Sequence, residues 1–369
     1  MTVLRHIIDP SIPVFLLCCL GLLILLRKCL RRDHFYVLVI GSLLGLLLAE
    51  GLCRLTGIGG NTRTAKWKED GMVSKGFPYA YQPNGQLLYH YPDNPRGYFN
   101  EKNEVLGTIN SKGFRGLDRD FEKNKGKIRL AFLGDSFTLG IGVKDEDTLP
   151  HDVEKELKPK YENVEVLNFG VSGSDTPYQI QLLERYGLKF KPDIVVVVLF
   201  LNDAKRKGTI GFLSRPVVLK QIRKYSYFIN ALAGSIEKAI LSKRMIRHYH
   251  EGFLDTSPGY QSVQSALMKG KALSSEHKFH FIVAVYPVFF RLKEGYPFRS
   301  IHQKIEKFCK NQNILFIDLL NAFSGKSDQE MWVHATDQHP NEVAHRLAAR
   351  EIAAYLRKEG LIDRMLQKH

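Results

Sequence analysis

Four short segments of this 369-residue chain contain side chains suited to acyl transfer. Ser136 directly follows an apolar run, so its hydroxyl and backbone N–H are expected at the open end of a buried strand. Gly173 ends a segment whose glycines let backbone approach a ligand closely, and Asn202 follows a third apolar run. Asp337 and His339 lie just before the final helical pattern. A hydroxyl nucleophile, an imidazole, a carboxylate and N–H donors for an oxyanion are what ester cleavage requires.

Each of these residues also has a purely structural explanation. Serine is a preferred helix N-cap, and glycines are common in ordinary turns between a strand and a helix. Asn-Asp pairs such as Asn202-Asp203 are frequent in turns, and a lone histidine in a loop is usually just solvated. The combination favours catalysis, because together the four segments supply every group that the reaction needs.

The four segments also resemble the sequence blocks of the SGNH hydrolases, the GDSL-type lipases and esterases. GDSFTLG (134–140) matches the nucleophile block, NFGVSG (168–173) the glycine block, LND (201–203) the asparagine block and DQHPN (337–341) the histidine block. The resemblance covers residues 105–358 in the family's order and includes INSKGFRG (109–116), which often precedes the nucleophile strand in membrane-tethered members. It implies that Ser136 is the nucleophile, His339 the base and Asp337 the orienting carboxylate. It also implies an oxyanion hole made by the N–H groups of Ser136 and Gly173 and the side chain of Asn202.

Two positions depart from the family pattern. Phe200 occupies the place of the usual glycine in the asparagine block, which is expected to narrow the pocket. Thr336 stands three residues before the histidine, where the family usually has aspartate, so Asp337 at two residues before takes the orienting role. Asp135 is a second carboxylate near the serine, and we expect it to hold the turn.

Strand and helix patterns alternate between these segments. Apolar runs at 128–135, 164–170, 192–200, 279–287 and 315–320 predict strands, and helical patterns fall near 147–160, 177–190, 261–276, 300–312 and 341–358. This order predicts an α/β fold, a doubly wound three-layer α/β/α sandwich with a mostly parallel five-stranded sheet of the flavodoxin-like kind. Sites in such sheets lie beyond the carboxyl ends of the strands.

The first 55 residues are expected to be a transmembrane hairpin with helices at about 10–26 and 35–53. One spanning helix with an interfacial one is the alternative. The linker at 27–32 carries four basic residues, and short basic loops stay in the cytoplasm, so the rest of the chain is predicted to lie outside. The basic residues Arg54, Arg63, Lys66 and Lys68 point the other way. Residues 56–126 are expected to form an irregular lead-in to a hydrolase domain at 127–360.

The formal net charge of +15 has a local source at residues 205–250, where eleven Lys and Arg face one acidic residue, Glu237. This segment predicts a helical insertion. A solvated surface and a contact with anionic lipid or an acidic polysaccharide are both open interpretations. An external, membrane-anchored domain argues against nucleic acid. No metal or cofactor is expected, and four of the five cysteines lie within the predicted anchor, which excludes a disulfide scaffold.

The sequence therefore predicts a membrane-anchored serine esterase that works through an acyl-enzyme without a cofactor. The resemblance and the expected location imply that its substrates are O-acyl esters, acetyl above all, on an envelope or exported glycan. A glycan O-acetyltransferase using the same Ser-His dyad is the first alternative. A non-catalytic envelope or glycan-binding module is the second.

Overall fold

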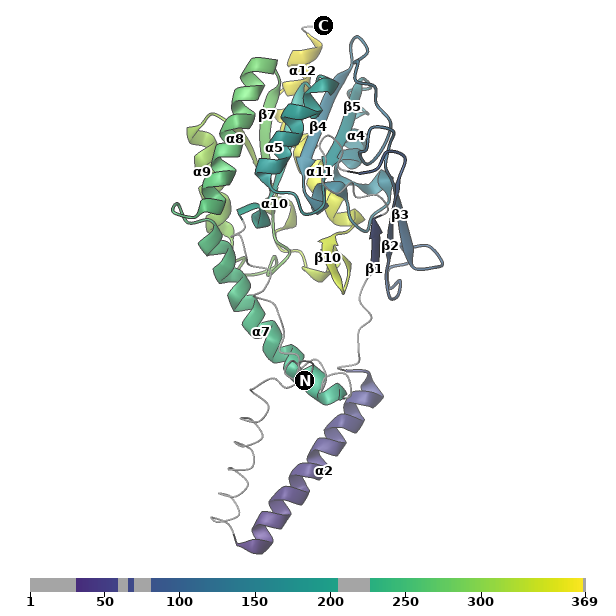
Figure 1. Ribbon diagram of the computed structural model, residues 1–369, viewed down its shortest axis with the longest axis vertical. Coiled ribbons are helices and arrows are strands. Elements are labelled where there is room, and N and C mark those ends of the chain that lie inside the picture. Colours follow the sequence, from purple (N-terminus) through teal and green to yellow (C-terminus); the bar gives the residue numbers. More distant parts are fainter. Residues whose placement is uncertain (1–30, 59–65, 70–80, 205–225, 368–369) are drawn as a thin grey trace, which may run out of the picture. The chain divides into compact units, whose positions relative to one another are not determined.

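Five parallel strands form the central sheet of the computed structural model, which describes residues 31–58, 66–69, 81–204 and 226–367 (Figure 1). The strands are β4 (Ile128–Gly134), β5 (Val164–Gly170), β6 (Ile194–Phe200), β7 (His280–Tyr286) and β8 (Leu315–Asp318), in the order β5-β4-β6-β7-β8. All four strand pairs are parallel. The five predicted strands and the predicted doubly wound sheet are thereby confirmed.

Helices cover both faces of this sheet. They are α4 (Leu149–Leu157), α5 (Thr176–Arg185), α8 (Pro258–His277), α9 (Arg299–Asn311) and α11 (Glu342–Lys358), each within a few residues of its predicted position. Helix α4 packs against α11, and α5 packs against α8. Right-handed crossovers place α4 on one face of the sheet and α5, α8 and α9 on the other. The short helices α10 (Leu320–Phe323) and α12 (Leu361–Leu366) complete the carboxyl-terminal part.

The sheet forms because its inner strands are apolar on both faces. All seven residues of β4 and of β6 are buried, and β6 contains the run Val195–Val198. Branched side chains suit a pleated surface covered by helices on both sides, and each buried valine contributes about 1.5–3 kcal/mol. The carboxyl ends of β4, β5 and β6 are consequently neighbours, which brings the segments that follow them to one edge.

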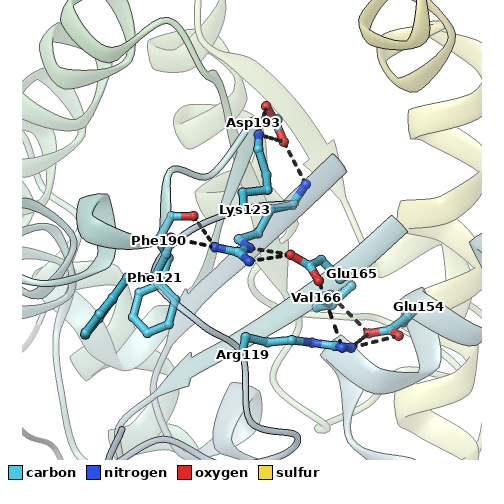
Figure 2. Close-up of polar contacts among 9 residues, drawn as sticks. Arg119, Phe121, Lys123, Glu154, Glu165, Val166, Phe190 and Asp193 are labelled. Carbon is cyan, nitrogen blue, oxygen red and sulfur yellow. Dashed lines mark hydrogen bonds and ion pairs between the residues drawn. The ribbon is translucent and has the colours of Figure 1, made fainter. Parts of the chain in front are cut away.

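Charged side chains are buried near the opposite, amino-terminal edge of the sheet (Figure 2). The Arg129 guanidinium on β4 contacts the carboxylate of Glu165 on β5 at 2.5 Å and donates to the carbonyl of Phe190. Two further ion pairs, Lys123–Asp193 and Arg119–Glu154, join the segment before β4 to the sheet and to α4. Arg129 and Glu165 are buried, so removing either one would leave a charge without compensation, whereas the other two pairs are partly exposed.

A three-stranded antiparallel sheet lies in the segment that was expected to be irregular. Its strands are β1 (Lys66–Glu69), β2 (Gln86–His90) and β3 (Glu104–Thr108). In β2 only Leu87 and Tyr89, which occupy alternate positions, are buried. An alternating apolar pattern with only two buried positions is too short to be recognised as a strand from the sequence. The expectation of an irregular lead-in was therefore wrong for these strands.

The chain divides into two compact units, one of residues 1–62 and 208–245 and the other of 63–207 and 246–369. In the first, the described residues form α2 (Arg32–Thr56) and most of α7 (Tyr227–Gly252). Helix α2 contains the second predicted membrane helix. The first, at 10–26, lies outside the described residues, as do 205–225 of the basic insertion.

Within the described residues, α2 is the one helix long and apolar enough to cross a bilayer, with a mean hydropathy of 2.1 and no buried residue. Membrane anchors and signal sequences share this length and composition. Its Glu50 carboxylate accepts hydrogen bonds from Ser226 Oγ at 2.8 Å and from the backbone N–H of Phe228 at 3.0 Å, which caps the amino terminus of α7.

Candidate active site

Ser136 begins a one-turn helix directly beyond β4. Asp135 caps this helix, α3 (Ser136–Leu139), by accepting a hydrogen bond from Phe137 N at 2.9 Å. The cap role that the sequence also allowed for Ser136 thus belongs to Asp135. The turn is tight, since a Cβ on Gly170 of β5 would lie 2.2 Å from the backbone nitrogen of Leu139. Glycine at that position lets α3 pack against β5 and places the serine at the edge of the sheet.

His339 and Asp337 lie on a short strand rather than in the loop that the sequence predicted. Strand β10 (Asp337–Pro340) pairs antiparallel with β9 (Trp332–His334). Side chains two residues apart on a strand point to the same side, and this spacing explains how aspartate at two residues before the histidine can reach the imidazole. Thr336 stands where the family usually has aspartate, and its hydroxyl bonds the ring of His334 at 2.8 Å.

A continuous chain of hydrogen bonds runs from the serine into the protein. His339 Nε2 lies 3.0 Å from Ser136 Oγ, and His339 Nδ1 lies 2.5 Å from Asp337 Oδ1. The second oxygen of Asp337 accepts a hydrogen bond from the Tyr91 hydroxyl at 2.8 Å. The structure therefore brings together the three side chains that the sequence singled out for proton transfer, and it adds Tyr91 beyond them.

The surroundings of Asp337 favour its charged form. Burial raises the pKa of this carboxyl, but hydrogen bonds from His339 and Tyr91 and the charge of His339 outweigh burial, and its pKa lies below the ordinary value. An ionised carboxylate at Nδ1 holds the imidazole with Nε2 directed at the serine. The pair can therefore accept a proton from the hydroxyl and stabilise the imidazolium that results.

Asn341 fixes the end of the histidine block. Its side chain is fully buried, accepts from the N–H of Val343 and Ala344 at the start of α11, and donates to the carbonyls of Glu330 and Trp332. One side chain thus caps α11 and supports β9, the partner strand of β10. This double role was not expected from the sequence, although Asn341 lies within DQHPN.

The oxyanion candidates follow the next two strands. Asn202 lies on the 3-10 helix η4 (Leu201–Ala204) after β6, and its amide donates one N–H to Asp135 Oδ2 at 3.1 Å. Gly173 has a φ of +73°, and its neighbours Val171 and Ser174 both donate to the carbonyl of Gly134. Both candidates are thereby connected to the turn that carries Ser136, and Asn202 keeps a second N–H for a ligand.

Arg115, from the INSKGFRG segment, holds the far end of the serine turn. Its guanidinium is completely buried and donates to the carbonyls of Leu139, Gly140 and Val143, while Nε contacts Asp145 at 2.8 Å. These carbonyls lie at the end of α3 and just after it, so one side chain bonds the turn at several points. This role of Arg115 was not expected from the sequence, because the contacts join residues 24 or more positions apart.

Aromatic rings form a wall beside the histidine. Phe200, which replaces the usual glycine, packs on Phe137 with ring centroids 4.1 Å apart, and Phe137 lies 5.6 Å from the His339 ring. Phe289 and Tyr286 extend this cluster. The Phe200 ring is buried within it, and the cluster makes one side of the site apolar.

The carboxyl edge of the sheet thus carries a serine, a histidine and an aspartate in one series of hydrogen bonds. The sequence model of the GDSL-like lipase/acylhydrolase family matches residues 132–347, and the chain belongs to that family. It is accordingly an ester-bond hydrolase. No cluster of three or more His, Cys, Asp or Glu that could hold a metal ion is found within the described ranges.

Two curated relatives are similar in sequence. The uncharacterized protein YpmR of Bacillus subtilis is 23% identical over 247 residues, which are 65% of this chain and 85% of that protein. An acetylxylan esterase of Xylanibacter ruminicola is 36% identical over 86 residues, 21% of this chain and 17% of the esterase.

Solved structures with a similar fold include other esterases. A catalytic mutant of Axe2, an acetylxylan esterase from Geobacillus stearothermophilus, aligns with a TM-score of 0.40 and 19% identity over 65% of this chain and 97% of Axe2. A two-domain esterase active on acetylated mannans aligns with a TM-score of 0.40 and 16% identity over 63% of this chain. The match spans about half, 49%, of that esterase.

The Tyr91 hydrogen bond generates a stability prediction. Tyr91→Phe leaves a buried carboxylate oxygen of Asp337 without its donor, so we expect a loss of about 1–3 kcal/mol in the free energy of unfolding at neutral pH. The hydrogen bond favours the ionised carboxylate and lowers the Asp337 pKa. Its contribution to the free energy of unfolding is therefore fully present above the pKa that this carboxyl has in the unfolded chain. This contribution decreases as pH falls through the Asp337 pKa of the folded protein, so the destabilisation by Tyr91→Phe should become smaller in acid. Urea unfolding across pH measures this.

Tyr98→Phe is the matched control, because the Tyr98 hydroxyl donates to Asp147 at 2.7 Å. Both variants should lose stability, but only Tyr91→Phe should lower kcat. Equal effects on kcat would show that Tyr91 has no special connection to the histidine.

Proposed function

We propose that this ester-bond hydrolase is a membrane-anchored serine esterase that works through an acyl-enzyme. The observation that carries the proposal is the hydrogen-bonded series from Ser136 through His339 to Asp337. Ser136 Oγ attacks the ester carbonyl while His339 Nε2 takes its proton. The C–O bond to the alcohol then breaks, and His339 returns the proton to the leaving oxygen. A water molecule, deprotonated by His339, next attacks the acyl-serine. The bond between the acyl carbon and Ser136 Oγ breaks, His339 returns the proton to Oγ, and the acid is released.

The developing oxyanion is expected to bind three N–H donors. These are the backbone N–H groups of Ser136 and Gly173 and the second N–H of the Asn202 amide. Asp135 supports this role, because its hydrogen bond holds the amide beside the serine turn. Preorganised donors act mainly on the transition state, where the oxygen carries full negative charge.

The proposed substrate is an acetylated glycan of the cell envelope or an exported one. The relative named acetylxylan esterase supports this class. A glycan O-acetyltransferase would use the same acyl-enzyme but pass the acyl group to a sugar hydroxyl instead of water. Analysis of the product, acetate or acetylated acceptor, separates the two. Reaction with a fluorophosphonate probe separates both from a non-catalytic binding module, which would not react.

The anchor is proposed to be the helical hairpin of residues 1–55, with the hydrolase part outside the cytoplasm. The exposed apolar surface of α2 supports a bilayer contact. Reporter fusions after residue 63 test the orientation, and an external reporter should be active there. Activity of a cytoplasmic reporter at the same position would overturn the orientation and the envelope location. The basic segment 205–250 is proposed to contact anionic lipid or an acidic polysaccharide.

The serine and histidine should behave as one unit. We expect Ser136→Ala and His339→Ala each to lower p-nitrophenyl acetate turnover on the order of 10³-fold or more, with the double variant scarcely worse than either. The base has no function once the nucleophile is gone. Ser172→Ala, in the loop after β5, is the control and should keep its activity. Losses that multiply in the double variant would show that the two side chains are not coupled.

The Asn202 amide should act on the transition state. Asn202→Ala should lower kcat by roughly 10²–10³, about 2.7–4 kcal/mol, with little change in KM. Asp203→Asn is the control, because Asp203 accepts a hydrogen bond from Thr176 Oγ1 at 2.7 Å and an amide oxygen can replace that contact. A kcat for Asn202→Ala within a few-fold of wild type, together with lower thermal stability, would reduce Asn202 to a turn residue.

A further inference from the structure

A groove outside the catalytic edge runs between α5 and α8, which lie side by side on one face of the sheet (Figure 1). Its volume is about 720 Å³, and Ile180 and Ala266 lie at its apolar floor. On α8 its lining extends from Pro258 to Lys269, a length of about 16 Å at 1.5 Å per residue. This is long enough for an extended ligand and too open for a small one.

The groove begins beside the candidate oxyanion helix. Both α5 and α8 start at the carboxyl edge of the sheet, and each contacts η4 there. Thr176, the first residue of α5, donates to Asp203 at 2.7 Å, and Gly259 of α8 packs so closely that a Cβ would lie 2.4 Å from the carbonyl oxygen of Ala204. One end of the groove, at Pro177 and Pro258, therefore adjoins the residues that contact Asp203 and Ala204, the neighbours of Asn202 on η4.

The lining favours an uncharged, hydroxyl-rich ligand. It combines the Tyr178 ring with the amides of Gln181 and Gln261 and the hydroxyls of Ser262 and Ser265. Sugar rings present apolar faces that pack on an aromatic ring and hydroxyl edges that bond amides and hydroxyls.

The charge of the groove lining also favours an uncharged ligand. Lys269 is the one charged residue of the lining, and its ammonium is 2.5 Å from the carboxylate of Glu184 on α5. A phosphate or an anionic headgroup would therefore meet a cation that is already neutralised.

We propose that this groove binds the glycan chain whose acetyl group is cleaved at Ser136. The inference rests on the proposed function and adds a second binding surface to it. Groove contacts far from the ester are the same in the ground and transition states, so they lower KM and leave kcat unchanged. Small esters cannot reach them.

The experiment compares acetylated xylohexaose, acetylated xylose and p-nitrophenyl acetate with the full-length enzyme. Wild type should have a KM for the hexaose at least about 10-fold below that for the monosaccharide, a gain near 1.4 kcal/mol. Tyr178→Ala combined with Gln261→Ala should abolish this difference, and Ser265→Trp, which fills the groove, should do the same. Neither variant should change turnover of p-nitrophenyl acetate.

Tyr355→Ala on α11, a half-buried tyrosine on a helix that packs with α4 away from this groove, is the matched control and should keep the chain-length gain. A wild-type KM that does not fall with chain length, or groove variants that keep the gain, would overturn the glycan groove. Lack of p-nitrophenyl acetate turnover by wild type would instead overturn the proposed esterase function itself.

Discussion

The hydrogen bond between His339 Nε2 and Ser136 Oγ joins side chains 203 residues apart, and much of the tertiary structure serves to keep these two atoms 3.0 Å apart. The parallel sheet places the serine at its edge, and a close packing contact between α3 and β5 sets the turn. On the other side, the β9–β10 hairpin carries the histidine, and buried Asn341 ties that hairpin to α11. Ser136 and His339 therefore lie on two separately supported elements, which fixes the distance between their side chains.

Buried polar groups mark both edges of the sheet. At the amino-terminal edge, Arg129 and Glu165 join β4 to β5. At the catalytic edge, Arg115 bonds the carbonyls that end the serine turn, and Asp135 holds Asn202. Desolvation offsets much of the attraction in buried ion pairs, so they add little net stability. We interpret these groups as determinants of geometry, because each one permits a single arrangement of the chain around it.

The amino-terminal unit differs from the sheet in the side chains that it exposes. Helix α2 exposes apolar side chains along its length, and its polar contacts gather near its end, where Glu50 accepts from the start of α7 and Arg54 bonds Glu50 at 2.7 Å. A carboxylate at a helix amino terminus satisfies N–H groups that the helix leaves unpaired. Helices α2 and α7, far apart in the sequence, are thereby joined by one capping interaction.

The sequence by itself determined the five strands, the main helices and the side chains of the candidate site. Strands buried on both faces must be continuous apolar runs, and amphipathic helices repeat their apolar residues every three to four positions. Ser136, Asn202 and His339 stand out because they are polar residues directly after or between these patterns. Only the tertiary structure decided that Tyr91 bonds Asp337 and that a small antiparallel sheet lies in the lead-in. These features depend on contacts between distant segments or on strands of three to five residues, whose patterns are too short to recognise, and a single sequence carries no local signal for them.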